Sequence, residues 1–181
     1  MKLLLFPACL PLLALLLLLG GCQQNDPTPQ LPGLPAQTQA GANTLGCYVN
    51  GRPWLPATTT PALTARVSPG RLLLQAVQGT GPDATTLRIE LSEGFHGAGT
   101  YALYFPDWAE NVASYTVAAG SQTYFADSLG GSQLIITRYD SAQGILAGNF
   151  AFRGVTRPFP NSAVPADTLR ISDGRFDLLL H

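Results

Sequence analysis

Few side chains in this chain are of the types that do chemistry, and they are scattered. The sequence has two histidines, His96 and His181, and His96 follows Glu93 by three residues in a glycine-rich stretch. A serine hydrolase also needs an activated serine, and the sequence contains no Gly-x-Ser-x-Gly elbow. A closed zinc site needs four ligands of the Cys or His type, which are missing. We therefore predict no catalytic residue, no metal and no cofactor, and interpret His96 as a solvated loop residue.

A short polar stretch offers oxygen ligands but too few of them. Asp107, Glu110 and Asn111 lie within five residues of one another. Calcium takes six to eight oxygen ligands, more than this stretch supplies. Side chains of these types more often cap a helix or stabilise a turn. The pattern therefore favours a turn over a calcium site.

Aromatic residues gather around this polar stretch. Five of them fall within residues 101–115. An exposed Trp108 could stack on a sugar ring while neighbouring polar groups bind its hydroxyls. The candidate ligand-binding residues are Trp108, Asp107, Asn111 and Tyr104. The competing interpretation is core packing, because Tyr101, Leu103 and Phe105 alternate as the inner face of a strand does. Packing is the favoured alternative, and a carbohydrate or small-ligand site stays open.

The N-terminus has the layout of a secretory signal. Lys2 precedes an apolar run over residues 3–19, and Gly20 and Gly21 precede Cys22. The run is about long enough to span a membrane as a helix. Two prolines interrupt it, and a polar segment follows, so a cleaved signal over residues 1–21 is the better interpretation.

The Leu19-Gly20-Gly21-Cys22 ending resembles a bacterial lipobox. In lipoproteins with this ending, the cysteine becomes the first mature residue and carries acyl chains. The resemblance implies that Cys22 anchors the protein to a membrane, which takes two or more acyl chains for durable binding. Gln23 stands where Asp signals retention in the inner membrane, so an outer-membrane location is expected. Whether the domain faces the periplasm or the cell surface stays open.

Composition limits the remaining partners. Once residues 1–21 are removed, Cys47 is the only cysteine besides Cys22, so no disulfide within the chain is expected. Cys47 stands in an apolar alternation and is expected to be a small buried hydrophobe. The mature chain has nine arginines and eleven acids in scattered positions, which argues against nucleic-acid binding. The expected partners are the membrane, through Cys22, and a glycan or an envelope protein.

The chain is expected to hold one domain after a spacer. Residues 22–43 are rich in Gln, Pro, Thr and Ala without an apolar period, which predicts a flexible tether. Residues 44–181 form the predicted domain. Its strands are expected at 45–49, 52–55, 62–68, 71–77, 85–91, 100–105, 112–118, 122–126, 133–139, 145–152 and 168–180.

About ten strands with turn signals every eight to twelve residues predict an all-β antiparallel fold. A β-sandwich and a partly closed barrel both fit, and the unequal strand lengths favour the sandwich. Asn50-Gly51 is a strong signal for a two-residue hairpin, and Pro53 predicts a short or edge strand after it. At Asp173-Gly174 the closing strand is expected to contain a bulge or a turn.

Two segments resemble a family of Bacteroidota lipoproteins of unknown function, described as DUF6252-like. One is the stretch from Gly41 to Trp54. The other joins Gly148-Asn149-Phe150-Ala151-Phe152 with Ile171-Ser172-Asp173-Gly174-Arg175-Phe176-Asp177. Leu45 replaces the family's usual Phe, and Asn149 its usual Thr. The resemblance implies a lipoprotein with an all-β domain and assigns no catalytic residue.

Overall fold

The structure is a computed structural model that describes residues 30–58, 62–103, 111–117, 122–129, 131–156 and 166–180. These residues form eleven β-strands and one short 3-10 helix. The elements are β1 (Thr44–Val49), β2 (Arg52–Trp54), β3 (Leu63–Ser68), β4 (Gly70–Gln78), η2 (Gly81–Asp83), β5 (Thr85–Phe95), β6 (Gly99–Ala102), β7 (Asn111–Val117), β8 (Gln122–Ala126), β9 (Gln133–Asp140), β10 (Ile145–Thr156) and β11 (Thr168–Leu179).

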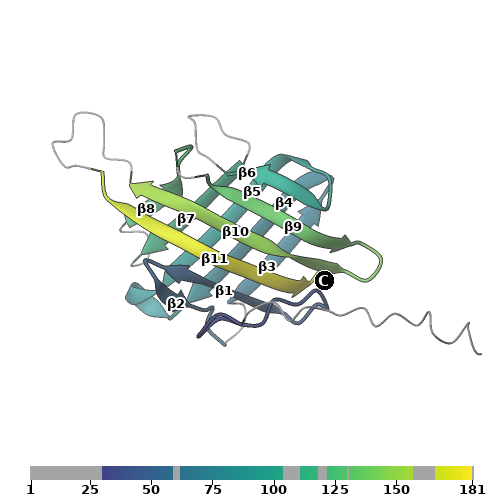
Figure 1. The fold of residues 1–181 in the computed structure, drawn as a ribbon, viewed down its shortest axis with the longest axis horizontal. Helices are drawn as coiled ribbons and strands as arrows, with labels where there is room; N and C mark the ends of the chain where they lie inside the picture. The colour runs from purple at the N-terminus through teal and green to yellow at the C-terminus, as the bar shows by residue number, and fades with distance from the viewer. Residues whose placement is uncertain are drawn as a thin grey trace, which may run out of the picture.

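All eleven strands belong to one antiparallel sheet, strongly curled into a half-barrel (Figure 1). The main path of hydrogen-bonded neighbours is β2-β1-β11-β10-β8-β7-β5-β4-β3, with β9 also paired to β10, and β6 to β9. The all-β antiparallel prediction is confirmed. Of the two architectures it left open, the structure has the partly closed barrel and not two separate sheets.

The long strand β10 explains why strands of unequal length still make one sheet. One edge of β10 pairs with β11 along almost its whole length. The other edge pairs with β9 over residues 145–151 and with β8 over residues 154–156. β10 therefore joins two arms of the sheet. One arm contains β8, β7, β5, β4 and β3, the other contains β11, β1, β2, β9 and β6, and the two arms cross one another in Figure 1. The unequal strand lengths favoured a sandwich in the sequence analysis. In the structure, two shorter strands share one edge of the long strand β10, so strands of unequal length form one sheet.

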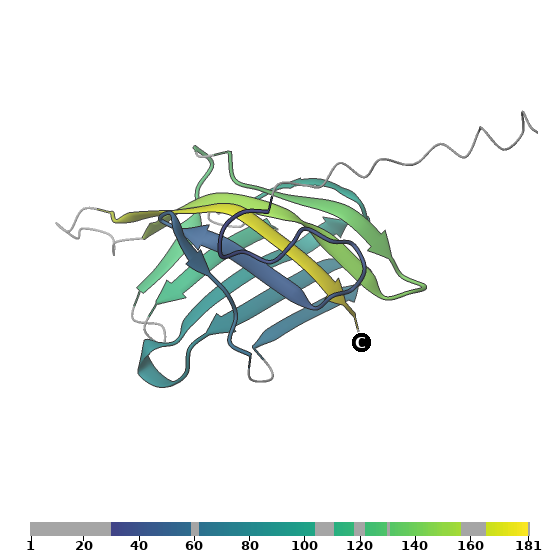
Figure 2. The same ribbon diagram turned by 60° about the horizontal axis from the view of Figure 1, so that its bottom comes forward.

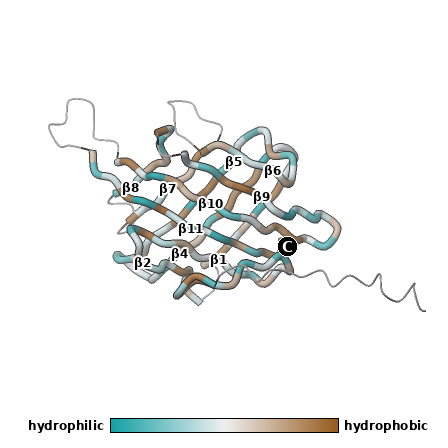
Figure 3. Tube along the Cα trace, in the orientation of Figure 1, coloured by the Kyte–Doolittle hydropathy of each residue, from teal (hydrophilic) through white to brown (hydrophobic). Residues whose placement is uncertain are grey.

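The core lies between the two crossing arms. Buried residues from both arms form a single hydrophobic cluster, with Leu74 and Ile89 from one arm and Leu134 and Ile171 from the other. Hydrophobic and hydrophilic positions alternate along the strands in Figure 3, as expected for a sheet with one face buried. Cys47 belongs to this cluster, which confirms its expected burial.

The first hairpin follows its sequence signals. Asn50 and Gly51 both have positive φ, at 49° and 77°, as a type I′ turn requires. The returning strand β2 has three residues and lies at one end of the sheet path, so Pro53 takes an edge position, where its missing N–H costs least. Both expectations for this hairpin are confirmed.

Reciprocal glycine–phenylalanine pairs join β10 and β11. Phe150 is the register partner of Gly174, and Gly148 is the partner of Phe176. A Cβ on Gly174 would lie 2.4 Å from the Phe150 ring, and one on Gly148 would lie 2.2 Å from the Ile135 carbonyl oxygen and 2.8 Å from the Phe176 ring. Each phenylalanine thus packs over a glycine of the neighbouring strand. These four residues are also those of the two terminal motifs in the sequence.

The closing strand contains a bulge next to these pairs. Phe150 pairs with Gly174 and Phe152 with Ile171, so β11 has one extra residue between the two pairs. Asp173 lies in this interval with φ of 53°, a left-handed conformation that Asp adopts more easily than most residues. The alternative left open in the sequence is therefore settled as a bulge within a continuous strand.

Residues 30–43, here called the strap, cross the outer face of the sheet. Figure 2 shows this dark purple segment lying over β1 and β11. Leu34 is buried, and its side chain and Pro35 lie against the position where Gly46 lacks a side chain. The sequence pattern assigned these residues to the flexible tether 22–43. The structure instead holds them against the sheet through contacts with residues distant in the sequence.

The Asp177 carboxylate fixes the strap. It is only 1% exposed and accepts hydrogen bonds from Thr38 Oγ1 at 2.6 Å, the Ala40 amide at 2.9 Å and the Gly41 amide at 2.7 Å. Burial by itself would raise the pKa of this carboxyl. The hydrogen bonds outweigh burial and hold the pKa below its ordinary value of 3.8. The charged form is therefore the one that holds the strap.

Replacing Asp177 by Asn tests this anchor. An amide keeps one acceptor oxygen but points an NH₂ group at backbone donors, so the unfolding free energy should fall by about 1–3 kcal/mol. Because the folded pKa is depressed, the stability that Asp177 contributes is present above its unfolded pKa and is lost as pH falls through the folded pKa. Urea denaturation across pH should show the two proteins converging in acid. Glu93→Gln, at an exposed carboxylate of β5, is the control and should leave stability unchanged.

The glycine–phenylalanine pairs give a second prediction. Gly174→Ala should destabilise the protein by about 1–3 kcal/mol, because its Cβ would overlap the Phe150 ring. Gly174 does not have a positive φ, so backbone strain does not contribute. In a Phe150→Leu background the same change should cost less, and denaturation of the four proteins forms a double-mutant cycle. Equal costs in both backgrounds would refute the pairing as the reason for glycine.

Candidate functional site

Most residues of the predicted ligand-binding group lie outside the described residues. Tyr104, Asp107 and Trp108 are among these, as is the lipidation candidate Cys22. Asn111, the remaining member, is the first residue of β7 and is half-buried. Its Oδ1 is buried and has no hydrogen-bond partner among the residues that the structure describes. A buried oxygen without a hydrogen bond costs free energy, so a hydrogen-bond donor at Asn111 Oδ1 would be stabilising.

The strand before this group packs as the core-packing interpretation expected. Tyr101 and Leu103 are both buried in the core. Trp54 is buried as well, donates from Nε1 to Thr85 Oγ1 at 2.8 Å, and contacts the Tyr115 ring edge-on. These aromatic residues stabilise the fold and are not available to stack on a ligand.

His96 is exposed and is held by a tyrosine. The Tyr101 hydroxyl lies 2.8 Å from His96 Nδ1, accepts the His96 amide at 3.1 Å and donates to the Gly97 carbonyl at 2.7 Å. Since the hydroxyl proton goes to Gly97, Nδ1 is assigned as the protonated nitrogen that donates to Tyr101. Within the described chain, the hydrogen bonds and the ring contact of His96 are all with Tyr101, and they stabilise the turn between β5 and β6.

Two further groups bear on reactivity in the described part of the chain. Burial raises the pKa of the Cys47 thiol to about 12, so this cysteine stays protonated and unreactive. Over the same described ranges, no three His, Cys, Asp or Glu side chains gather as a metal ion would need. No helix within those ranges is long and apolar enough to cross a membrane.

A hollow on the outer face, here called the arginine hollow, contains a buried charge. It has a volume of about 250 Å³ and is open between the strap and strands β9, β10 and β11. Its polar and apolar lining includes Gln37, Gln133, Ile135, Asn149, Asp173 and Arg175. Asn149 and Arg175 are register partners, so their side chains stand beside each other on the same face.

Arg175 is only 6% exposed, yet its guanidinium has few partners. Nη1 donates to the Pro35 carbonyl of the strap at 3.3 Å, and Nε is buried without a hydrogen-bond partner among the described residues. The ion pairs between described residues belong to Arg88, Arg138 and Arg153. Arg175 therefore has no carboxylate within ion-pair distance among the described residues. A buried charge in this situation is costly, and the site would be stabilised by an anion.

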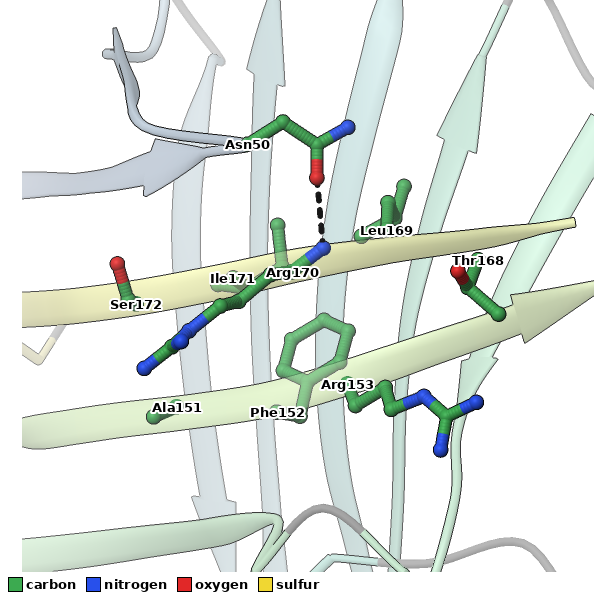
Figure 4. A pocket seen from close by; sticks show the side chains of 9 residues that line it. All are labelled: Asn50, Ala151, Phe152, Arg153, Thr168, Leu169, Arg170, Ile171 and Ser172. Atoms are coloured by element: carbon green, nitrogen blue, oxygen red, sulfur yellow. Dashed lines mark hydrogen bonds between the residues drawn. The ribbon is translucent and has the colours of Figure 1, made fainter.

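A second hollow of about 430 Å³ lies farther along the same two strands. Arg153 and Arg170 are register partners there, but Figure 4 shows their side chains pointing away from one another. Arg153 pairs with Asp127 at 3.3 Å, and the Arg170 amide donates to Asn50 Oδ1 at 2.8 Å. The two guanidinium groups do not converge, so this hollow is not arranged to bind one anion between them.

An apolar groove runs along the open side of the half-barrel. One part, about 660 Å³, lies between the strap, β1 and β3, and an adjacent part of about 400 Å³ reaches the end of β11. Leu55 and Leu179 line it, at 40% and 37% exposed. The groove marks where β2 and β3, the two ends of the sheet path, fail to meet.

Comparison with known proteins adds no assignment to these sites. No family model, no curated protein and no solved structure matches the chain. The motifs at Gly148 and Gly174 are accounted for by packing in this fold. Arg175 was part of one of those motifs in the sequence. Its position between Gly174 and Phe176 in an alternating strand was the signal that it faces away from the core, but its burial depends on the strap.

Proposed function

We propose that this chain is a lipid-anchored protein of the bacterial outer membrane whose β-domain is a non-enzymatic binding module. The anchor rests on the signal-like residues 1–21 and on Cys22 at the lipobox position. The observation that carries the binding role is Arg175, a buried arginine that lines an open hollow and has no counter-charge from the described part of the chain. The locked His96 and the protonated Cys47 support a module that binds without catalysing.

The strap changes the expected distance between anchor and domain. With residues 30–43 docked on the sheet, only residues 23–29 separate Cys22 from the first described residue, which lies eight positions after Cys22. Eight residues reach at most about 30 Å when fully extended. The domain would therefore operate close to the bilayer, where a membrane-surface glycan or an envelope protein is the accessible partner.

A second candidate is carbohydrate binding by the loop around Trp108. It is favoured by one observation: at the start of β7, the buried Oδ1 of Asn111 has no hydrogen-bond partner within the described ranges. A sugar hydroxyl would satisfy this acceptor while Trp108 stacks on the ring. The two candidates place the ligand on different strands, so single substitutions separate them.

Fractionation of cells tests the anchor. Cys22→Ser should leave the membrane fraction, because the acylated sulfur is lost and a protein without two or more acyl chains does not stay bound. Cys9→Ser is the matched control, since Cys9 lies within the predicted signal, and it should sediment as the wild type does. Unchanged sedimentation of Cys22→Ser would rule out the lipid anchor.

A glycan array with three proteins tests the binding role. If the arginine hollow is the site, Arg175→Lys should lose most of the signal of the wild type while Trp108→Ala keeps it. Lysine retains the charge but not the planar fork that binds carboxylates with two hydrogen bonds. Loss in Trp108→Ala alone would assign binding to the aromatic loop. Identical signals from all three proteins would remove both sites from consideration.

A further inference from the structure

We propose that the arginine hollow binds a hydroxylated monocarboxylate of the size of one sugar acid, with its carboxylate on Arg175. This deepens the proposed function, on which it rests, by naming the ligand class. The guanidinium of Arg175 is buried in the sheet, and no carboxylate of the described residues lies within ion-pair distance of it. Buried guanidinium groups in proteins are normally paired, and the missing partner here has to be an anion.

The nearest acids on the same strand do not fill this role. The Asp177 oxygens accept three hydrogen bonds from the strap. Asp173 lines the hollow but is exposed and makes no ion pair with Arg175. Among the described residues the guanidinium donates only through Nη1, over 3.3 Å, which leaves N–H groups that a carboxylate could accept from.

The remaining lining indicates hydroxyl groups on the ligand. Asn149 of β10 lies beside Arg175 of β11. Gln37 from the strap and Gln133 from β9 are the other carboxamides that line the hollow. Each carboxamide offers one acceptor oxygen and two donor hydrogens, which suits hydroxyls that both donate and accept. Ile135 adds an apolar surface for the carbon face of a ring. This mixture of polar groups and an apolar patch is typical of small-molecule sites.

Charge and size restrict the ligand further. Asp173 places a negative charge in the same hollow, which disfavours ligands with two or more negative charges, such as phosphate. A volume of about 250 Å³ is below the roughly 300–1,000 Å³ of pockets for drug-sized molecules. A single sugar acid with one carboxylate satisfies both limits.

Calorimetric titration of the mature protein in detergent micelles tests this proposal with D-glucuronate. D-glucose is the matched neutral probe, since it has the same ring without the carboxylate. Glucuronate should bind at least about ten times more tightly than glucose, which corresponds to about 1.4 kcal/mol. Inorganic phosphate should bind more weakly than glucuronate because of Asp173.

Two variants with opposite expected effects keep the test sharp. Arg175→Lys should weaken glucuronate binding by about tenfold or more, since a point charge replaces the fork. Asp173→Asn should strengthen it, because a negative charge beside the ligand is removed, and Asn tolerates the φ of 53° at this position. Arg170→Lys, outside the hollow, should leave affinity unchanged. Thermal unfolding of each variant checks that the fold is intact.

Several results would overturn the ligand assignment. These are no heat with glucuronate at millimolar concentration, equal affinity for glucose, or an affinity that Asp173→Asn lowers. If Arg175→Lys does not fold, the ligand assignment is decided by whether Asp173→Asn raises or lowers the affinity for glucuronate. Failure here together with a glycan signal that depends on Arg175 would reject the sugar acid and keep the proposed binding module. The Cys22→Ser fractionation tests the anchor independently of all these outcomes.

Discussion

Two phenylalanines packed over two glycines of the neighbouring strand hold β10 and β11 together, and the rest of the sheet depends on this pairing. β10 is the only described strand that touches both arms, through β9 and β8, while β11 joins it to β1 and β2. The rings of Phe150 and Phe176 lie 6.4 Å apart and fill the space that side chains at Gly148 and Gly174 would occupy. Glycine weakens a strand, and cover by a cross-strand aromatic ring compensates for this.

The same alternation decides what the outer face carries. Side chains alternate between the two faces along β11. Phe176 and Leu178 face the core, so Arg175 and Asp177 face outward, under the strap. Their environments differ in one respect. Asp177 receives three hydrogen bonds, which lower its pKa despite burial, whereas Arg175 receives no counter-charge from any described residue. One charge of the strand is therefore used to hold the strap, and the other is left facing a hollow.

The strands and hairpins could be predicted from the sequence because their signals are local. Neighbouring residues alone are enough to recognise the alternation of Leu87, Ile89 and Leu91 and the turn at Asn50-Gly51. The docking of residues 30–43 could not be predicted, because a segment rich in Gln, Pro and Thr without an apolar period gives no local signal. Its stability comes from Asp177, more than 130 positions away. Nor could the single sheet be recognised, because local patterns do not show that two successive strands, β8 and β9, share one edge of β10.

The strap links the two halves of the proposed function physically. It supplies Gln37 and the Pro35 carbonyl to the arginine hollow, and the chain before it leads back to Cys22 within eight residues. A ligand that bridges Arg175 and Gln37 would add contacts between β11 and the strap, beyond those of Asp177. Binding and strap docking would then stabilise each other by linkage, because each favours the same arrangement of residues 30–43. In the proposed lipoprotein, the segment that leads from the anchor to the domain would also be one wall of the binding site.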